Sequence, residues 1–522
     1  MFKGLHFIGY KRSGLSNETF YSNNPATNTA IPVNYHEVTY KEIDLAVNLA
    51  VNAFYQINDL GLEKRRKFLT LIATLLEEND SQIINICNQE TALPFDRLRN
   101  ELNRTVGQIR LFAELLSNPW FLDIRIDYGN PDRKPVPKHD IRQMQIPLGP
   151  VAVFGASNFP LAFSVAGGDT ISALAAGCPV IFKAHPLHPA TSEIVAELII
   201  KAAQQTNMPE GIFNLIYCKD NIGGQMLVEH PDIKAVAFTG SFNGGKSIFD
   251  IAAKRKTPIP VFAEMGSINP VFIFAEAQKN NTDKLAIEIF NSLTNGCGQF
   301  CTNPGLIFIQ ESKDRENLLN RLTQFFRQWQ GGIMLSDTIK NEYNRKINNI
   351  IKTQNVKYVS SSLMSENHCK GYIFIADFET YINDPGFNEE VFGPSGILIL
   401  TKTINDFEIA VNNIQGVLSA SIYSTEEKVK EYKTFIKQLS YKAGRINFNN
   451  MPTGVEVGHA IVHGGPFPAT TNSQYTSVGS ASIKRFLRPV CFQNFPENAI
   501  SDYLWSDNKY KIHRLIDGCL KK

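Results

Sequence analysis

The region between residues 147 and 264 alternates short apolar runs with helix-like segments, and this alternation constrains the fold more than any other feature. The expected elements are strands at 151–154, 180–183, 213–217 and 235–239 and helices at 161–176 and 192–204. Parallel strands that are covered on both faces read as apolar runs of this kind. The pattern therefore predicts an α/β domain with a helix-wound parallel sheet, which binds ligands beyond the carboxyl ends of its strands.

The regions on either side predict three further parts of the fold. Apolar residues recur every three or four positions over 41–118, which is typical of helices. The stretch 123–146 alternates around an Asn-Pro-Asp turn, which predicts a β-hairpin. A second α/β region is expected after Asn269, with its strands at 306–309, 396–400 and 420–423.

Composition excludes some function classes. The 522 residues are enough for two or three domains, and 52 basic against 50 acidic residues give no electrostatic argument for binding nucleic acid or a membrane surface. The eight cysteines form no Cys-x-x-Cys pair, so we expect reduced thiols in the cytoplasm and no metal site. The apolar stretch 149–182 is interrupted by polar residues and prolines, so it does not predict a membrane span.

The octet at 240–247, GSFNGGKS, matches the P-loop pattern letter for letter and follows a predicted strand. One interpretation is a nucleoside triphosphatase that uses Lys246. Another is a helix N-terminus that holds the pyrophosphate of a dinucleotide. A third is a glycine-rich turn without a ligand. The octet alone does not separate these three hypotheses.

A second motif surrounds a cysteine. The stretch 295–305, NGCGQFCTNPG, places Cys301 on a glycine-rich turn, where backbone N–H groups can stabilise a thiolate. The same stretch also fits a buried, inert thiol. Four polar residues in other motifs accompany the octet and this cysteine: Asn158, an amide donor, Lys183, a cation where ribose or phosphate would lie, and the carboxylates Glu264 and Glu390. Taken singly, each could instead be a capping residue or a solvated charge.

The order and spacing of these motifs, from about Phe20 to about Phe467, resemble the aldehyde dehydrogenase superfamily. The resemblance implies an α/β fold with a Rossmann-type cofactor domain, an α/β catalytic domain and a β-hairpin for oligomerisation. The implied ranges are 1–122 and 147–265 for the NAD(P)-binding domain, 266–450 for the catalytic domain, and 123–146 and 471–522 for the oligomerisation hairpin and C-terminal segment. It further implies a cytoplasmic homodimer or homotetramer that acts on a small-molecule aldehyde.

The resemblance also implies a role for each motif residue. Cys301 would attack the aldehyde carbon, Asn158 with the Cys301 backbone N–H would hold the oxyanion, and Glu264 would activate the water that hydrolyses a thioester. The residues implied to hold the cofactor are Lys183, Gly240, Ser241, Gly245, Glu390 and Phe392. Many NAD-preferring members carry an acidic residue where this chain has Pro186, so NADP is slightly favoured over NAD.

Three passages, 149–164, 183–189 and 452–470, resemble the α-ketoglutarate semialdehyde (2,5-dioxopentanoate) dehydrogenases within the superfamily. Such a substrate needs a cation or amide donors for its carboxylate. Arg104 and Gln108 lie four apart on a predicted helix, so they share one face and are our candidates.

Other hypotheses stay open at this point. One is a fatty or aliphatic aldehyde dehydrogenase, similar to those of luminous bacteria. A P-loop nucleotide hydrolase and a catalytically silent relative are the others. The histidines of the 452–470 passage, His459 and His463, are interpreted as structural.

Overall fold

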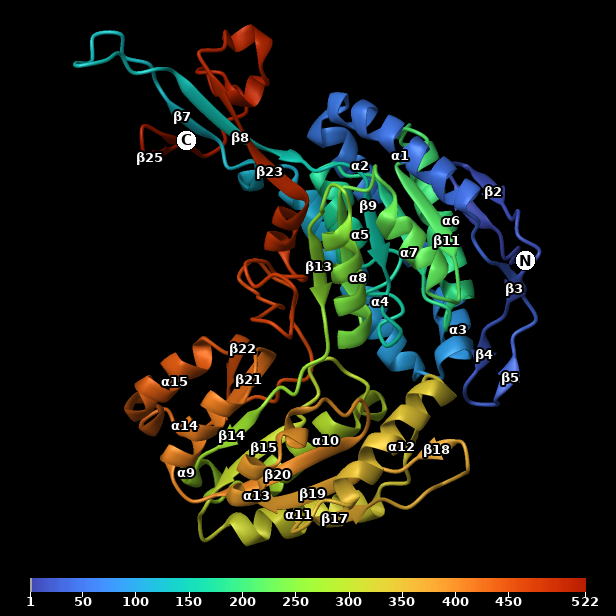
Figure 1. The fold of residues 1–522 in the computed structure, drawn as a ribbon, viewed down its shortest axis with the longest axis vertical. Coiled ribbons are helices and arrows are strands. Elements are labelled where there is room, and N and C mark those ends of the chain that lie inside the picture. Colours follow the sequence, from blue (N-terminus) through green and yellow to red (C-terminus); the bar gives the residue numbers. More distant parts are fainter. Residues whose placement is uncertain (1) are drawn as a thin grey trace.

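The computed structural model describes residues 2–522, which form two α/β lobes and a projecting arm (Figure 1). The upper lobe contains a seven-stranded sheet with the order β13-β12-β9-β10-β11-β1-β2. Its strands are β1 (His6–Ile8), β2 (Lys11–Ser13), β9 (Val151–Phe154), β10 (Val180–Ala184), β11 (Phe213–Tyr217), β12 (Ala235–Thr239) and β13 (Val261–Glu264). The five strands from β9 to β13 are parallel, and β1 and β2 extend the sheet in antiparallel fashion.

Helices cover both faces of this sheet, and buried apolar clusters lie on each side. They are α1 (Tyr40–Asp59), α2 (Gly61–Glu78), α3 (Asp80–Thr91), α4 (Phe95–Leu115), α5 (Gly168–Ala176), α6 (Pro189–Gln205), α7 (Ile222–Glu229) and α8 (Phe242–Lys254). Short strand pairs β3 (Thr19–Phe20) with β6 (Tyr35–His36) and β4 (Asn23–Asn24) with β5 (Thr29–Ala30) lie near the N-terminus. The α/β fold that the alternation predicts is confirmed.

The helix expected over 161–176 is shorter than predicted, because α5 begins only at Gly168. The residues before it form turns instead. The backbone N–H groups of Leu161 and Ala162 donate to the buried carboxylate of Glu101, at 2.8 and 2.9 Å. These long-range bonds replace the first helical turns and hold the segment that follows β9 in a fixed loop.

The lower lobe contains a second seven-stranded sheet, with the order β17-β19-β20-β15-β14-β21-β22. Its strands are β14 (Val271–Ile273), β15 (Leu306–Gln310), β17 (Lys357–Ser360), β19 (Tyr372–Asp377), β20 (Ser395–Thr401), β21 (Val417–Tyr423) and β22 (Ala443–Phe448). Its helices are α9 (Ala275–Gln278), α10 (Thr282–Thr294), α11 (Arg315–Gln328), α12 (Asp337–Ile351), α13 (Phe378–Asn383), α14 (Ile404–Asn413) and α15 (Lys433–Ser440). A small pair, β16 (Gly332–Ile333) with β18 (His368–Cys369), completes it.

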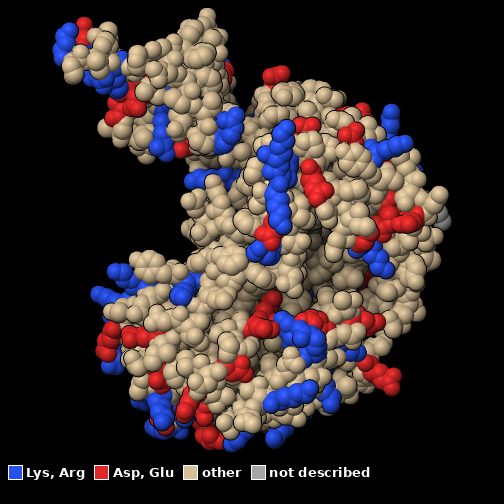
Figure 2. Space-filling view, in the orientation of Figure 1, with Lys and Arg blue, Asp and Glu red and all other residues tan. Residues whose placement is uncertain are grey.

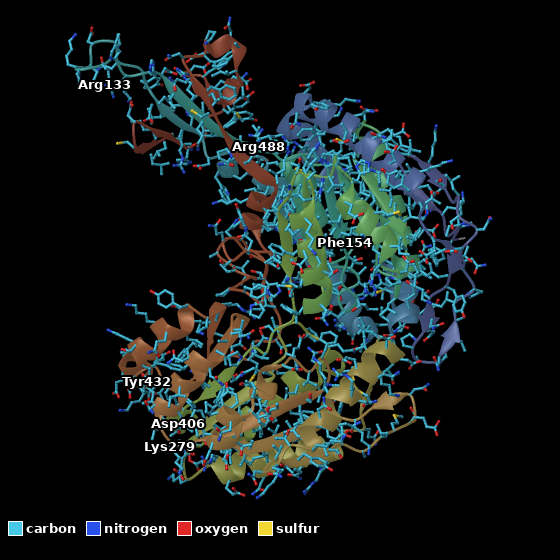
Figure 3. All side chains as sticks on the ribbon, in the orientation of Figure 1. Arg133, Phe154, Lys279, Asp406, Tyr432 and Arg488 are labelled. Carbon is cyan, nitrogen blue, oxygen red and sulfur yellow. The ribbon has the colours of Figure 1, made fainter. Side chains whose placement is uncertain are left out.

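The arm is a five-stranded sheet with the order β23-β8-β7-β24-β25. Its strands are β7 (Arg125–Asp127), β8 (Ile141–Pro147), β23 (Leu487–Gln493), β24 (Arg514–Ile516) and β25 (Cys519–Lys521). Figure 3 shows Arg133 near the tip of the arm and Arg488 where the arm joins the upper lobe. The expected hairpin of β7 and β8 is therefore present, and its role in oligomerisation stays a prediction.

Among residues 2–522, no helix combines the length and apolar character that crossing a bilayer requires. Figure 2 shows Lys and Arg interspersed with Asp and Glu over the visible face, and a hollow between the two lobes.

Candidate active site

Cys301 lies in the loop between the short 3-10 helix η2 (Asn295–Gly298) and β15. Cys297 and Gly298 in this stretch have left-handed φ values of 57° and 67°, and a Cβ atom on Gly298 would lie 2.2 Å from the carbonyl oxygen of Gly393. Only glycine allows so close an approach of two backbones. The loop of Cys301 therefore packs directly on the segment that follows Glu390.

The backbone of Cys301 is held by Asn269, which the sequence analysis did not single out. The fully buried amide of Asn269 donates to the carbonyls of Cys301, Ser267 and Asn303 at 2.8, 3.2 and 3.0 Å. Its own oxygen accepts the N–H of Ser419 at 3.2 Å. Its position directly before a proline, close to Glu264 in the sequence, was the only available signal.

Glu264 ends strand β13 and is 3% exposed. A β-bridge between Glu264 and Thr470 brings the segment around residue 463 alongside this strand. On that segment, His463 places its Nε2 atom 3.1 Å from Oε2 of Glu264 and 3.7 Å from Sγ of Cys301. One ligand atom from each of the three residues lies within 4.8 Å of the others. The ring of His463, interpreted from the sequence as structural, therefore contacts both candidate catalytic groups.

Burial and nearby charges both act on the Cys301 thiol. Burial raises the pKa of the Cys301 thiol well above its ordinary value, and the negative charges of Glu264 and Glu390 raise it further, while Arg104 acts in the opposite direction. Neither carboxylate oxygen of Glu264 receives a well-aligned hydrogen bond. The Cys301 sulfur thus lies beside an imidazole nitrogen and near a carboxylate whose oxygens can still accept hydrogen bonds.

Asn158 follows β9, and its side-chain amide donates to the carbonyl of Gln299 at 2.9 Å. Because Gln299 lies two residues before Cys301, this bond places an amide donor beside the cysteine loop. The carbonyl of Asn158 in turn accepts a hydrogen bond from Arg97 at 2.7 Å.

Arg97 connects the loop of Asn158 to the loop of Cys301. Its guanidinium carbon lies 5.2 Å from the ring centroid of Phe159 and 4.9 Å from that of Phe300. The two rings meet edge to face at 5.2 Å. These residues directly follow Asn158 and directly precede Cys301, so cation–π and aromatic contacts fix the two loops together.

The glycine octet forms the start of α8, which begins at Phe242 with Ser241 as its N-cap. The Ser241 hydroxyl accepts the N–H of Gly244 at 3.3 Å, and the N–H of Gly240 donates to the carbonyl of Glu264 at 3.1 Å. A Cβ atom on Gly245 would lie 2.7 Å from Met265, so the helix packs closely on the end of β13. Its first N–H groups lack helical partners and suit an anionic pyrophosphate.

The P-loop hypothesis is wrong. From Phe242 onward the octet is helical, so no glycine loop remains to wrap around phosphates. The side chain of Lys246 is paired with Asp250 on the same helix, with Nζ–O distances of 2.6 and 2.7 Å.

Three further cofactor candidates lie on strand β10 or in the loop before β20. Lys183 is half-buried on β10. Glu390 accepts the N–H of Ser267 at 3.3 Å, and a Cβ atom on Gly266 would lie 1.9 Å from one of its oxygens. Burial raises the pKa of Glu390 to about 7. Phe392, two residues further on, is half-buried.

The two substrate candidates on α4, Arg104 and Gln108, have different surroundings. Arg104 is half-buried, donates from Nε to the carbonyl of Val455 at 3.4 Å, and lies 5.3 Å from the ring centroid of Phe163. Its charge acts on the Cys301 thiol, as described above. Gln108 is buried, and its amide nitrogen packs against Gly168 at the start of α5.

Comparisons with known proteins agree with this geometry. Residues 11–467 match the model of the Aldehyde dehydrogenase family. An alpha-ketoglutaric semialdehyde dehydrogenase of Acinetobacter baylyi is 42% identical over 99% of this chain and 98% of its own length. Alpha-ketoglutaric semialdehyde dehydrogenase 2 of Azospirillum brasilense is 41% identical over 91% of each chain.

Solved structures show the same fold at lower identity. Betaine aldehyde dehydrogenase from Staphylococcus aureus, in complex with NAD+, has a TM-score of 0.81 at 19% identity and covers 97% of this chain and 100% of its own. An NAD+ complex of aldehyde dehydrogenase from Bacillus cereus has a TM-score of 0.80 at 21% identity and covers 94% and 96%. With the family model spanning most of its length, the chain belongs to the aldehyde dehydrogenase family.

Proposed function

We propose that this enzyme oxidises α-ketoglutarate semialdehyde to 2-oxoglutarate with NAD(P) through a thioester on Cys301. The observation that carries the proposed chemistry is the contact of one imidazole nitrogen, Nε2 of His463, with both the Cys301 sulfur and the Glu264 carboxylate. A nucleophile with a raised pKa needs an adjacent base, and here the base is in turn oriented by a third group.

The first step is proton removal from Cys301. When Nε2 of His463 carries its lone pair, it accepts the thiol proton; it then carries an N–H directed toward Glu264 at 3.1 Å. The negative charge of Glu264 stabilises the imidazolium that forms, as in other nucleophile–base–acid arrangements. The proton therefore leaves the sulfur without passing through solvent.

The thiolate then attacks the aldehyde carbon. The developing oxyanion is held by the amide of Asn158, which has a second N–H besides the one given to Gln299, and by the backbone N–H of Cys301. One such donor contributes about 3–4 kcal/mol to the transition state. The bound dinucleotide supplies the hydride acceptor.

The thioester on Cys301 must finally be hydrolysed. Both oxygens of Glu264 have free acceptor capacity, so this carboxylate orients and deprotonates the attacking water. The departing sulfur recovers a proton from His463, which restores the resting thiol.

The residues present fit a dinucleotide. The N-terminus of α8 at Ser241 would take the pyrophosphate, while Lys183 and Glu390 with Phe392 would hold the riboses. Pro186 leaves no acidic group at its position to repel a 2′-phosphate, so we propose a slight preference for NADP over NAD. A homodimer or homotetramer in the cytoplasm, joined through the arm sheet, is part of the same proposal.

The substrate proposal rests on the two relatives of about 42% identity and on Arg104. The guanidinium lies near enough to influence the pKa of Cys301; its Nε donates to the Val455 carbonyl and it lies over the Phe163 ring, and neither contact uses its terminal N–H groups. Its terminal N–H groups can therefore pair with the distal carboxylate of a semialdehyde. Gln108 is the weaker of the two candidates, because its amide packs on Gly168.

The decisive experiment compares steady-state oxidation of α-ketoglutarate semialdehyde with that of a medium-chain aliphatic aldehyde, using NAD and NADP. The wild type should prefer the semialdehyde. Arg104→Ala should raise its KM by about tenfold or more and leave KM for the aliphatic aldehyde unchanged, with Arg104→Lys in between. An unchanged KM for the semialdehyde would refute the role of Arg104. If the wild type preferred the aliphatic aldehyde, the proposed substrate would be wrong, while the proposed cysteine chemistry would stand.

A further inference from the structure

We propose that Cys301, His463 and Glu264 also form a binding site for a thiophilic divalent cation of the Zn²⁺ type, and that occupation of this site inhibits the enzyme. The three side chains supply one sulfur, one nitrogen and one oxygen ligand, all within 4.8 Å of one another. This mixed donor set is typical of zinc sites and unlike the all-oxygen sites of Mg²⁺ or Ca²⁺.

The distances fit a tetrahedral ion. Zinc–ligand bonds of ordinary length at tetrahedral angles place a nitrogen and an oxygen ligand about 3.4 Å apart, and a sulfur and a nitrogen ligand about 3.6 Å apart. In the structure, Nε2 of His463 lies 3.1 Å from Glu264 and 3.7 Å from Cys301. For these two pairs, shifts of a few tenths of an ångström would therefore suffice, and the sulfur and the carboxylate oxygen lie within 4.8 Å of each other.

The site also has unsatisfied polar capacity. Glu264 is 3% exposed, yet neither of its oxygens receives an aligned hydrogen bond. A buried carboxylate in this condition is costly, and a cation would relieve the cost. The three ligands come from three separate segments, and Asn269 and the bridge at Thr470 already fix two of these segments in place. The ion would therefore have to order little of the chain when it binds.

Binding consumes the groups on which oxidation depends. The ion replaces the thiol proton of Cys301, which passes to solvent, and forms a sulfur–metal bond. The metal-bound thiolate cannot attack an aldehyde, and the lone pair of His463 and an oxygen of Glu264 are occupied at the same time. The inhibition should be reversed by a chelator, since no covalent bond to carbon forms.

The test measures metal binding directly, so it does not depend on the proposed substrate. Purified, reduced full-length enzyme is titrated with Co²⁺ and then with Zn²⁺. We expect one Co²⁺ per chain, with an intense near-ultraviolet thiolate-to-cobalt band that Zn²⁺ abolishes by displacement. Cys301→Ser should lose the band, and His463→Gln should weaken binding by about tenfold or more. His459→Gln and Cys297→Ser are matched controls that should leave the cobalt band and the metal affinity unchanged.

Turnover of any aldehyde that the wild type accepts should fall to near zero at one equivalent of Zn²⁺ and return with a chelator. The proposal is overturned if the cobalt band is absent, if it persists in Cys301→Ser, or if His463→Gln binds as tightly as the wild type while retaining the wild-type thermal midpoint. Should His463→Gln prove unstable, Glu264→Gln provides the second ligand variant, with the same expected loss of affinity.

Discussion

Cys297 and Cys301 lie four residues apart on one loop, yet their surroundings differ completely. The sulfur of Cys297 lies 3.1 Å from that of Cys369 and belongs to an apolar cluster of the lower lobe. The sulfur of Cys301 lies 3.7 Å from His463, beside Glu264. The hydrogen bond to Cys369 and burial raise the pKa of Cys297, while burial and the charge of Glu264 raise that of Cys301.

A raised thiol pKa therefore does not separate an inert cysteine from a nucleophile in this loop. The difference lies in what stands next to the sulfur: another thiol in one case, a proton acceptor in the other. The glycine-rich turn supplies both positions, and the acceptor comes from a segment 162 residues away.

The strongest test of this contrast removes each sulfur in turn. Cys301→Ala should reduce aldehyde oxidation by about 10⁴-fold or more, because the nucleophile is lost. Cys297→Ala should keep most of the activity, since its sulfur contacts only core groups. Steady-state formation of the reduced cofactor measures both. Comparable losses in the two variants would contradict the assignment of Cys301 alone as the nucleophile, because both cysteines would then be needed for activity.

The next test changes the charge beside Cys301. Glu264→Gln removes a negative charge that raises the Cys301 pKa, so the thiolate should form at lower pH. The pH profile of alkylation by iodoacetamide should move to lower pH accordingly. Turnover should fall by about 10²–10⁴-fold, because water activation is lost.

Glu390→Gln is the matched control for this shift, because the charge of Glu390 raises the same pKa to a smaller extent. It should move the alkylation profile in the same direction by less. An alkylation profile that is unchanged in Glu264→Gln would show that this carboxylate does not govern the thiol.

A third test addresses how the oxyanion donor is held. Arg97→Ala breaks the bond to the Asn158 carbonyl and both aromatic contacts, and should lower kcat by about tenfold to a hundredfold. If Arg97 acts through Asn158, the double variant Arg97→Ala/Asn158→Ala should be no slower than Asn158→Ala alone. Arg99→Ala is the control, because Arg99 lies on the same helix in an exposed ion pair with Asp80. Additive losses would show that Arg97 does not act through Asn158.

Much of the fold could be predicted from sequence, because the apolar runs at β9 to β12 are local signals of buried parallel strands. The start of α5 could not, because its delay depends on a carboxylate from a distant helix, Glu101. At this helix the local pattern failed because tertiary hydrogen bonds replaced helical ones.

Some residues of the candidate site could likewise be predicted from the sequence, and others could not. Cys301 and Glu264 lie in compact motifs whose order and spacing mark them. Arg97 lies in no such motif, and its contacts form only when separate segments come together. His463 lies in the 452–470 passage, but its contact with Glu264 depends on the backbone bridge that places this passage beside β13.

The smallest expected effect is on stability, and it tests whether Cys297 serves only the packing of the lower lobe. Cys297→Ser places a hydroxyl where a sulfur now contacts Cys369 in an apolar cluster, so it should cost about 1–2 kcal/mol and lower the thermal midpoint by a few degrees. The alkylation rate of Cys301 should stay unchanged, because the groups next to its sulfur are His463 and Glu264 and not Cys297. Cys491→Ser, at an exposed position on the arm, should change neither quantity. If Cys297→Ser instead altered Cys301 alkylation, the core contact would be helping to position the nucleophile, and the two cysteines would have to be treated as one unit.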